Sequence, residues 1–128
     1  MLPGDAERLM GAARTALRNA VAPRSGFRVG AALLTGEGDI VTGCNIENPS
    51  LMLTVCAERV ALLKALSEGR RSFRAMAVAC GDGRECFPCG ACRQMLAEFA
   101  PGLVLLLDAP EGMKKYALEE LLPHRFIP

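Results

Sequence analysis

The sequence has no tryptophan, one tyrosine and one histidine, and aromatic residues make up only 5% of its 128 positions. Proteins that hold single-stranded nucleic acid need a basic groove and aromatic side chains on which bases can stack. The formal net charge is +1, and the basic residues are scattered singly or in pairs such as Arg70-Arg71. Neither feature of a nucleic-acid-binding surface is present, so we expect no nucleic-acid partner.

Long apolar runs are also missing. No stretch approaches the ~18 apolar residues of a membrane span, and the first segment, Met1–Ala22, carries several charged residues. It therefore fits neither a membrane helix nor a secretory signal. Six cysteines in such a chain indicate a reducing cytoplasm and metal chemistry rather than a disulfide framework. We expect a cytoplasmic protein without membrane contact.

Hydrophobic residues make up 51% of the chain although aromatics are few. Alanine, leucine and valine must therefore build the core, which favours close packing of helices on a sheet. The length fits one domain covering residues 1–128. The remaining apolar surface could be buried by contacts between subunits.

The order of apolar segments predicts a layered α/β domain. Helical periodicity runs over Asp5–Ala22, and helices are also expected from Thr54 to Gly69 and from Pro88 towards Glu98. The predicted strands are Phe27–Leu34, Ile40–Cys44, Arg74–Cys80, Leu103–Leu107 and, at an edge, Lys114–Ala117. The nearly all-apolar composition of Leu103–Leu107 favours a central position. Leu118–Leu122 is expected to form a last helical turn.

Two short segments carry the candidate chemistry, Cys56-Ala57-Glu58-Arg59 and Pro88-Cys89-Gly90-Ala91-Cys92. Thr54 is a plausible N-cap for the first helix, and Pro88 suits the first turn of the second. The spacing of Cys89 and Cys92 places both on one helical face. Crossover helices begin at the carboxyl edge of a sheet, so the two helix starts should meet there. Three thiolates and one open position are typical of a catalytic zinc.

Cys86-x-x-Cys89-x-x-Cys92 also permits an iron–sulfur interpretation, but such a cluster needs a fourth nearby cysteine. Cys86 is then expected to be a free loop thiol that is open to oxidation. Cys44 and Cys80 lie in predicted strands and fit small core residues. The single histidine, His124, is expected to be exposed in a loop.

The chain resembles the small homotetrameric zinc-dependent cytidine deaminases. The matching motifs are Phe27-x-Val29-Gly30-Ala31-Ala32, Gly43-Cys44-Asn45-Ile46-Glu47-Asn48, Cys56-Ala57-Glu58-Arg59 and Pro88-Cys89-Gly90-Ala91-Cys92-Arg93-Gln94. The resemblance implies a three-layer α-β-α fold with a mixed five-stranded sheet. It also implies one zinc per subunit on Cys56, Cys89 and Cys92, and a homotetramer that shares active sites between subunits.

The resemblance further implies hydrolysis of cytidine and deoxycytidine to the uridine nucleosides in pyrimidine salvage. Zinc hydroxide would attack C4 while Glu58 shuttles protons. Arg59 would hydrogen-bond a ligand sulfur, with Gln94 a weaker candidate for the same support. Asn45 and Glu47 would bind the ribose hydroxyls. The remaining substrate contacts would come from Phe27, Ala57 and, reaching over a neighbouring subunit's base, Phe126.

Other interpretations of these residues remain open. Arg59 and Arg93 could be surface ion-pair partners, which for Arg93 is the preferred interpretation, and Phe27 could be a core residue. Two segments, Arg24-Ser25 and Asn48-Pro49-Ser50-Leu51-Met52, depart from the family pattern. A leucine at position 51 cannot supply the tyrosine hydroxyl usual there. The alternatives are therefore a deaminase of blasticidin S or 4-substituted cytidines, and a zinc-stabilised binding module without turnover.

Overall fold

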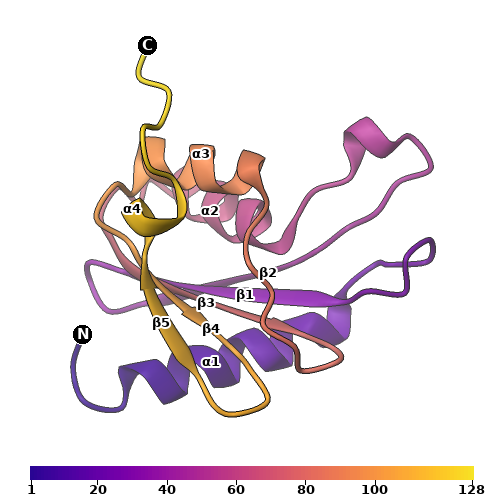
Figure 1. Cartoon of the computed structure of the whole chain (residues 1–128), viewed down its shortest axis with the longest axis horizontal. Coiled ribbons are helices and arrows are strands. Elements are labelled where there is room, and N and C mark those ends of the chain that lie inside the picture. The colour runs from indigo at the N-terminus through magenta and orange to yellow at the C-terminus, as the bar shows by residue number, and fades with distance from the viewer.

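The computed structural model describes residues 1–128 and contains one five-stranded sheet with helices on both faces (Figure 1). The strands are β1 (Val29–Thr35), β2 (Ile40–Cys44), β3 (Phe73–Cys80), β4 (Val104–Leu107) and β5 (Lys114–Ala117). The helices are α1 (Asp5–Ala16), α2 (Ala57–Ser67), α3 (Gly90–Phe99) and α4 (Leu118–Leu121), with short 3-10 turns at η1 (Leu17–Asn19) and η2 (Leu51–Leu53). No helix is long and apolar enough to cross a membrane.

The sheet is mixed, as the family resemblance implies. Its strand order is β2-β1-β3-β4-β5, in which β3 and β4 are parallel and all other neighbours are antiparallel. The edge position predicted for Lys114–Ala117 is confirmed. The leucine-rich β4 lies between β3 and β5, so it is an interior strand, while the middle position belongs to β3. Leu105, Leu106 and Leu107 are all buried, because helices cover both faces of the sheet there.

Three layers result from the alternation of side chains along the strands. In β1, Ala32 and Leu34 pack with Leu9 and Met10 of α1 on one face. Ala31 and Leu33 point the other way, into a cluster that includes residues of α2 and α3. Figure 1 shows α1 alone on one side of the sheet and the other helices opposite it. Small alanines at these contacts let helices approach the sheet closely, which explains a core with few aromatics.

The first helix is shorter than the periodicity of Asp5–Ala22 predicts. It ends at Ala16, one 3-10 turn follows, and Ala20 is already extended. Val21 then donates its N–H to the carbonyl of Asn45 and accepts from the N–H of Glu47. This bridge to the chain beyond β2 outweighs the helical preference of Ala20 and Val21.

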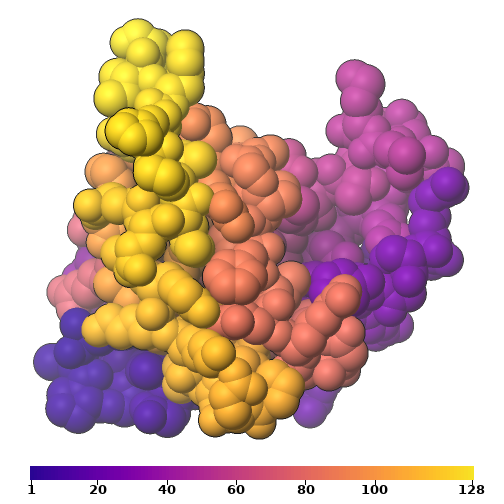
Figure 2. All heavy atoms as spheres, viewed as in Figure 1, coloured from indigo at the N-terminus to yellow at the C-terminus, as the bar shows by residue number.

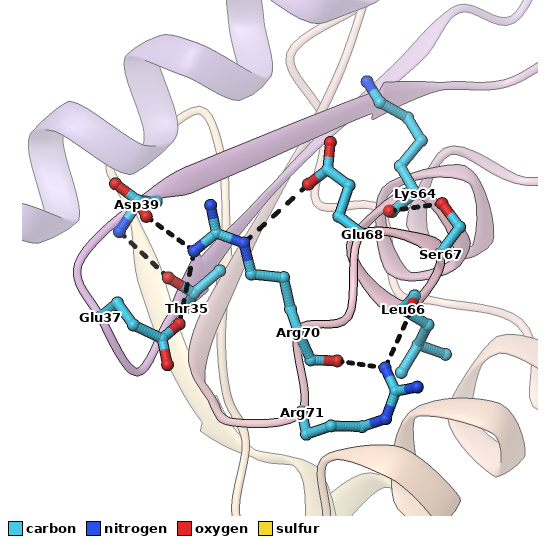
Figure 3. Close-up of polar contacts among 9 residues, drawn as sticks. All are labelled: Thr35, Glu37, Asp39, Lys64, Leu66, Ser67, Glu68, Arg70 and Arg71. Atoms are coloured by element: carbon cyan, nitrogen blue, oxygen red, sulfur yellow. Dashed lines mark hydrogen bonds and ion pairs between the residues drawn. The ribbon is translucent and has the colours of Figure 1, made fainter.

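A polar cluster fixes the edge of the sheet at which β3 begins (Figure 3). Arg70, in the connection from α2 to β3, places Nη1 2.6 Å from Asp39 Oδ2 and 3.4 Å from Glu37 Oε1 in the turn between β1 and β2. Its Nε lies 4.0 Å from Glu68 Oε1. The cluster ties the C-terminal end of α2 to the hairpin, so the N-terminus of α2 is directed to the opposite edge.

Candidate metal centre and substrate cavity

The two cysteine-bearing helices begin with a cysteine as N-cap. Cys56 (φ −69°, ψ 153°) precedes α2, and Cys89 (φ −68°, ψ 168°) precedes α3. Both helices thus start later than expected. Thr54 is not the N-cap of α2; its Oγ1 accepts the N–H of Asn48 instead. Pro88 stands before the N-cap of α3 rather than in its first turn.

The three cysteine sulfurs converge at the carboxyl edge of the sheet, as predicted. Cys56 Sγ lies 3.9 Å from Cys89 Sγ, and Cys89 Sγ lies 3.5 Å from Cys92 Sγ. Cys89 is the N-cap of α3 and Cys92 is its third residue, so both lie on the same side of the helix. All three sulfurs lie within 4.8 Å of one another. Cys86 is outside this group, so the four cysteines that an iron–sulfur cluster requires are not assembled.

The charge state of the thiols fits a soft, divalent cation. Three thiols this close compete for protons: Cys92 and then Arg59 stabilise a thiolate at Cys56 and lower the pKa of Cys56 to about 5. That thiolate in turn raises the pKa of Cys92. A cation held between the sulfurs replaces the protons, and three thiolates on the N-terminal turns of two helices suit zinc. With only these three protein ligands, an ion held there would have room for a reacting molecule.

Glu58 is the second residue of α2, beside the cysteine cluster. Only 4% of its surface is exposed, and no other acidic residue is as deeply buried. The pKa of Glu58 is raised to about 7, mainly by burial and in smaller part by the Cys56 thiolate, while the Arg59 guanidinium opposes the shift. A carboxyl group with this pKa can both accept and return a proton near neutral pH.

Arg59 lies between the cluster and the preceding loop. Its Nη2 is 3.6 Å from Cys56 Sγ and 3.5 Å from the carbonyl oxygen of Thr54. Its Nε is buried without a hydrogen-bond partner, and no carboxylate pairs with the guanidinium. Arg59 is therefore not a surface ion-pair partner, and the neighbouring Cys56 and Cys92 thiolates raise its own pKa.

A cavity of about 210 Å³ opens directly beside Glu58 and the cysteines. Most of its lining is apolar, and it is built by the start of β1, the loop before α2 and the segment before α3. The lining residues are Phe27, Val29, Asn45, Thr54, Val55, Cys56, Ala57, Glu58, Cys86, Phe87 and Cys89.

Two of the predicted substrate residues line this cavity, Phe27 just before β1 and Ala57 at the start of α2. Phe27 presents its ring there, with the Arg84 guanidinium 4.4 Å from the ring centroid. It is also packed against the main core cluster, so both interpretations of Phe27 describe part of its position. Ala57 is fully buried at the start of α2. Any larger side chain at position 57 would fill the floor of the cavity.

Asn45 and Glu47 have partners within the chain. Asn45 accepts the N–H of Val29 at 2.9 Å and donates to the carbonyl of Phe27 at 2.8 Å, which fixes the start of β1 against the cavity. Glu47 accepts from the Ser25 hydroxyl and from the Arg24 N–H, and these bonds hold its pKa below the usual range. Asn45 lines the cavity, whereas Glu47 lies outside its lining.

Gln94, in α3, contacts the C-terminal tail that carries Phe126. Gln94 Nε2 donates to the carbonyl of Phe126 at 3.1 Å, and the Phe126 side chain is 71% exposed. The preferred interpretation of Arg93 is wrong. Arg93 forms no ion pair and donates instead to the carbonyls of Pro88 and Leu121, at 2.8 and 2.9 Å. It thereby joins the segment before α3 to α4.

Sequence reasoning missed five residues of the cavity wall, Val29, Thr54, Val55, Cys86 and Phe87. Cys86 is half-buried against the core, and burial raises its pKa to about 12, so it is not a readily oxidised loop thiol. Its place beside the cysteine motif was the only signal for it. Cys80 is buried as expected, Cys44 is only partly buried, and His124 is exposed.

Comparison with known proteins agrees with this geometry. Residues 3–107 match the family described as the cytidine and deoxycytidylate deaminase zinc-binding region. The cytidine deaminase of Sporosarcina psychrophila is 44% identical over 124 residues, which cover 95% of this chain and 91% of that protein. The blasticidin-S deaminase of Bacillus cereus is 32% identical over 77% of this chain and 76% of its own length.

The fold has a similar counterpart among solved structures. The crystal structure of cytidine deaminase from Burkholderia pseudomallei superposes with a TM-score of 0.90 at 41% identity, over 98% of this chain and 100% of that one. Sequence, fold and the cysteine cluster therefore all agree with the same family.

Proposed function

The chain belongs to the cytidine and deoxycytidylate deaminase zinc-binding family, and from this premise we propose that it hydrolyses cytidine and deoxycytidine to uridine and deoxyuridine with release of ammonia. The observation that carries the proposal is the meeting of three cysteine sulfurs and the buried Glu58 at one apolar cavity. Cys56, Cys89 and Cys92 would hold one zinc ion per subunit.

When bound, zinc supplies a Lewis acid that turns water into a nucleophile near neutral pH. Glu58 is the proton carrier: its carboxylate takes a proton from the attacking water, delivers a proton to N3 of the base, and assists departure of the amino group as ammonia. Burial suits Glu58 to this task, because a carboxyl group with a pKa of about 7 can both take up and release a proton near neutral pH.

Arg59 would offset the excess negative charge of the metal centre. Three thiolates outnumber the charge of a divalent ion, which weakens the ion as a Lewis acid. The Arg59 guanidinium, 3.6 Å from Cys56 Sγ, withdraws charge from that sulfur. Gln94 contacts the tail, so its contribution would be to hold the C-terminus near α3.

The cavity would receive the pyrimidine ring, with Phe27 against its face and Ala57 at its floor. Asn45 and Glu47 would bind the ribose hydroxyls at the neighbouring edge. Since a site that pairs with sugar hydroxyls rejects ligands without them, free cytosine should be a poor substrate. The blasticidin S alternative has weaker support, because the match to that enzyme is lower in identity and in coverage.

We further propose a homotetramer with shared active sites, acting in pyrimidine salvage in the cytoplasm as a single domain, residues 1–128. Figure 2 shows two projections on one side of the chain, the C-terminal tail and the loop around residue 50. Their exposed apolar side chains, Leu51, Met52, Leu53, Phe126 and Ile127, support burial against other subunits. All six cysteines are free, as expected in a reducing compartment.

The test is ammonia release by zinc-loaded protein offered cytidine, deoxycytidine, a 4-substituted cytidine, blasticidin S and free cytosine. The proposal expects turnover of the two ordinary nucleosides and little with free cytosine. Turnover of blasticidin S or the 4-substituted cytidine alone would replace the substrate. No turnover of any compound, with zinc bound, would favour a binding module.

A further inference from the structure

The wall of the cavity formed by Cys86 and Phe87 has little support from its own backbone. Residues 81–88 connect β3 to α3 without regular structure. Hydrogen bonds hold both ends: the Arg84 carbonyl accepts from Cys80 Sγ, and the Pro88 carbonyl accepts from Arg93. Between them, no backbone hydrogen bond within the chain involves residues 85–87. Side-chain contacts must therefore set the position of this wall.

The single tyrosine of the chain, Tyr116 in the edge strand β5, makes two such contacts. Its hydroxyl donates to Glu85 Oε2 at 2.5 Å. Its ring lies 5.2 Å from the Phe87 ring, centroid to centroid, at an interplanar angle of 59°, a favourable tilted arrangement. Both partners are about 30 positions away in sequence and flank Cys86 on either side.

The register of β5 directs Tyr116 towards the cavity side of the sheet. Tyr116 pairs with Leu105, whose side chain belongs to the cluster under α2 and α3. Its neighbour Lys115 pairs with Leu106, which packs on the α1 side. Because side chains alternate along a strand, Tyr116 and Lys115 point to opposite faces. Lys114, on the same side as Tyr116, adds a weaker contact, 4.0 Å from Glu85 Oε1.

We propose that Tyr116 is a positioning residue for substrate binding: through Glu85 and Phe87 it holds residues 85–87 as the fixed wall of the cavity. The inference rests on the proposed function, since it assigns this wall to nucleoside binding. Tyr116 does not line the cavity and touches neither the cysteine cluster nor Glu58. It therefore acts on the fit of the substrate and not on the chemical step.

Kinetics of four variants test the proposal: Tyr116→Phe, Glu85→Ala, the double variant and Lys115→Met as the matched control on the other face of β5. Tyr116→Phe keeps the ring contact and removes only the hydroxyl. Loss of one hydrogen bond should raise KM for cytidine by about threefold to tenfold. The value of kcat and the zinc content should change less than about twofold. If the pair acts as a unit, the double variant should be no worse than either single one.

A conservative variant separates positioning from general destabilisation. Glu85→Gln retains a carbonyl oxygen that can accept a hydrogen bond from the Tyr116 hydroxyl. Its KM should therefore stay near the native value, in contrast to that of Glu85→Ala. An unchanged KM in Tyr116→Phe would refute the proposal. So would an equal rise in Lys115→Met, or a loss confined to kcat.

A second measurement does not depend on turnover. Alkylation of Cys86 by iodoacetamide, followed by peptide mass mapping of zinc-loaded protein, should be slow in the native chain because the thiol is half-buried. Tyr116→Phe should accelerate it about as much as KM rises, while Lys115→Met should not. If the native protein does not deaminate cytidine, the proposed function fails, and the alkylation rate alone decides whether Tyr116 holds the wall. Equal rates in both variants would overturn the inference.

Discussion

Gly43 of β2 lies directly under Ala57, the first residue of α2. A Cβ on Gly43 would come 2.6 Å from the carbonyl oxygen of Ala57 and 2.5 Å from the backbone nitrogen of Ala61. Real Cβ atoms do not approach backbone this closely, so only glycine allows α2 to rest on β2 here. The contact fixes the distance between the start of α2 and the sheet, and with it the positions of Cys56 and Glu58.

Replacing Gly43 should therefore harm both stability and the site. Gly43→Ala must push α2 away from the sheet, and we expect a loss of about 1–3 kcal/mol in the free energy of unfolding, together with weaker zinc retention. Urea unfolding and zinc content after dialysis against a chelator measure the two effects.

Gly11 provides the control, because it lies inside α1 with open space around its Cβ position. Gly11→Ala should stabilise the chain by about 0.5–1 kcal/mol and leave zinc retention unchanged. If Gly43→Ala behaved like Gly11→Ala, the close approach of α2 would not be what positions the site.

Removing one cysteine of the cluster should abolish zinc binding. A structure with three protein ligands cannot lose one without a large drop in affinity, so Cys89→Ser should retain less than about a tenth of an equivalent of zinc per chain. The metal content of purified protein measures this. Cys44→Ser removes a thiol outside the cluster and should keep one equivalent. A fully loaded Cys89→Ser variant would show that another set of residues binds the metal.

Regular structure was predictable from the sequence where apolar patterning dominates. The all-apolar strands and the amphipathic first helix follow directly from it. The helix starts were not predictable to the residue, since cysteine is an unusual N-cap and Thr54 is a better one by local preference. The structure instead holds Thr54 and Val55 extended, because Val55 pairs with Ile46 and Thr54 Oγ1 accepts the N–H of Asn48.

The same distinction applies to the site. The cysteines and Glu58 stand in a compact motif, so they were identified from the sequence. The contacts of Arg93 with Leu121 and of Tyr116 with Glu85 join segments about 30 residues apart. No periodicity or local motif marks such pairs, and only the folded chain brings them together.

The ion pair between Arg14 of α1 and Asp108 after β4 should stabilise the fold at neutral pH and lose this effect in acid. Two hydrogen bonds of 2.8 Å join the side chains, and they hold the pKa of Asp108 below its usual 3.8. A carboxylate with a lowered pKa stabilises the fold above its unfolded pKa, and this contribution is lost as pH falls through the folded value.

Arg14→Met should therefore cost up to about 1 kcal/mol in the free energy of unfolding at pH 7, a modest value because Arg14 is largely exposed. The difference between native and variant proteins should shrink as pH falls below the usual pKa of aspartate. Urea unfolding of both proteins at pH 7 and pH 3 gives the comparison. A difference that stayed constant would mean that the arginine acts through packing alone.

Glu58→Gln isolates the proton carrier from the metal centre. The amide is nearly the same size as the carboxylate and cannot shuttle a proton, so zinc content and folding should be retained. Its kcat for cytidine should fall by about 10²–10⁴, the usual contribution of a positioned general acid–base group.

The most direct test is the rate of ammonia release from cytidine by the native chain and by Glu58→Gln at equal zinc content. We predict sustained release by the native protein and a loss of at least about a hundredfold in the variant. Equal rates would contradict the role of Glu58, and no release by the zinc-loaded native protein would contradict the assignment of cytidine as its substrate.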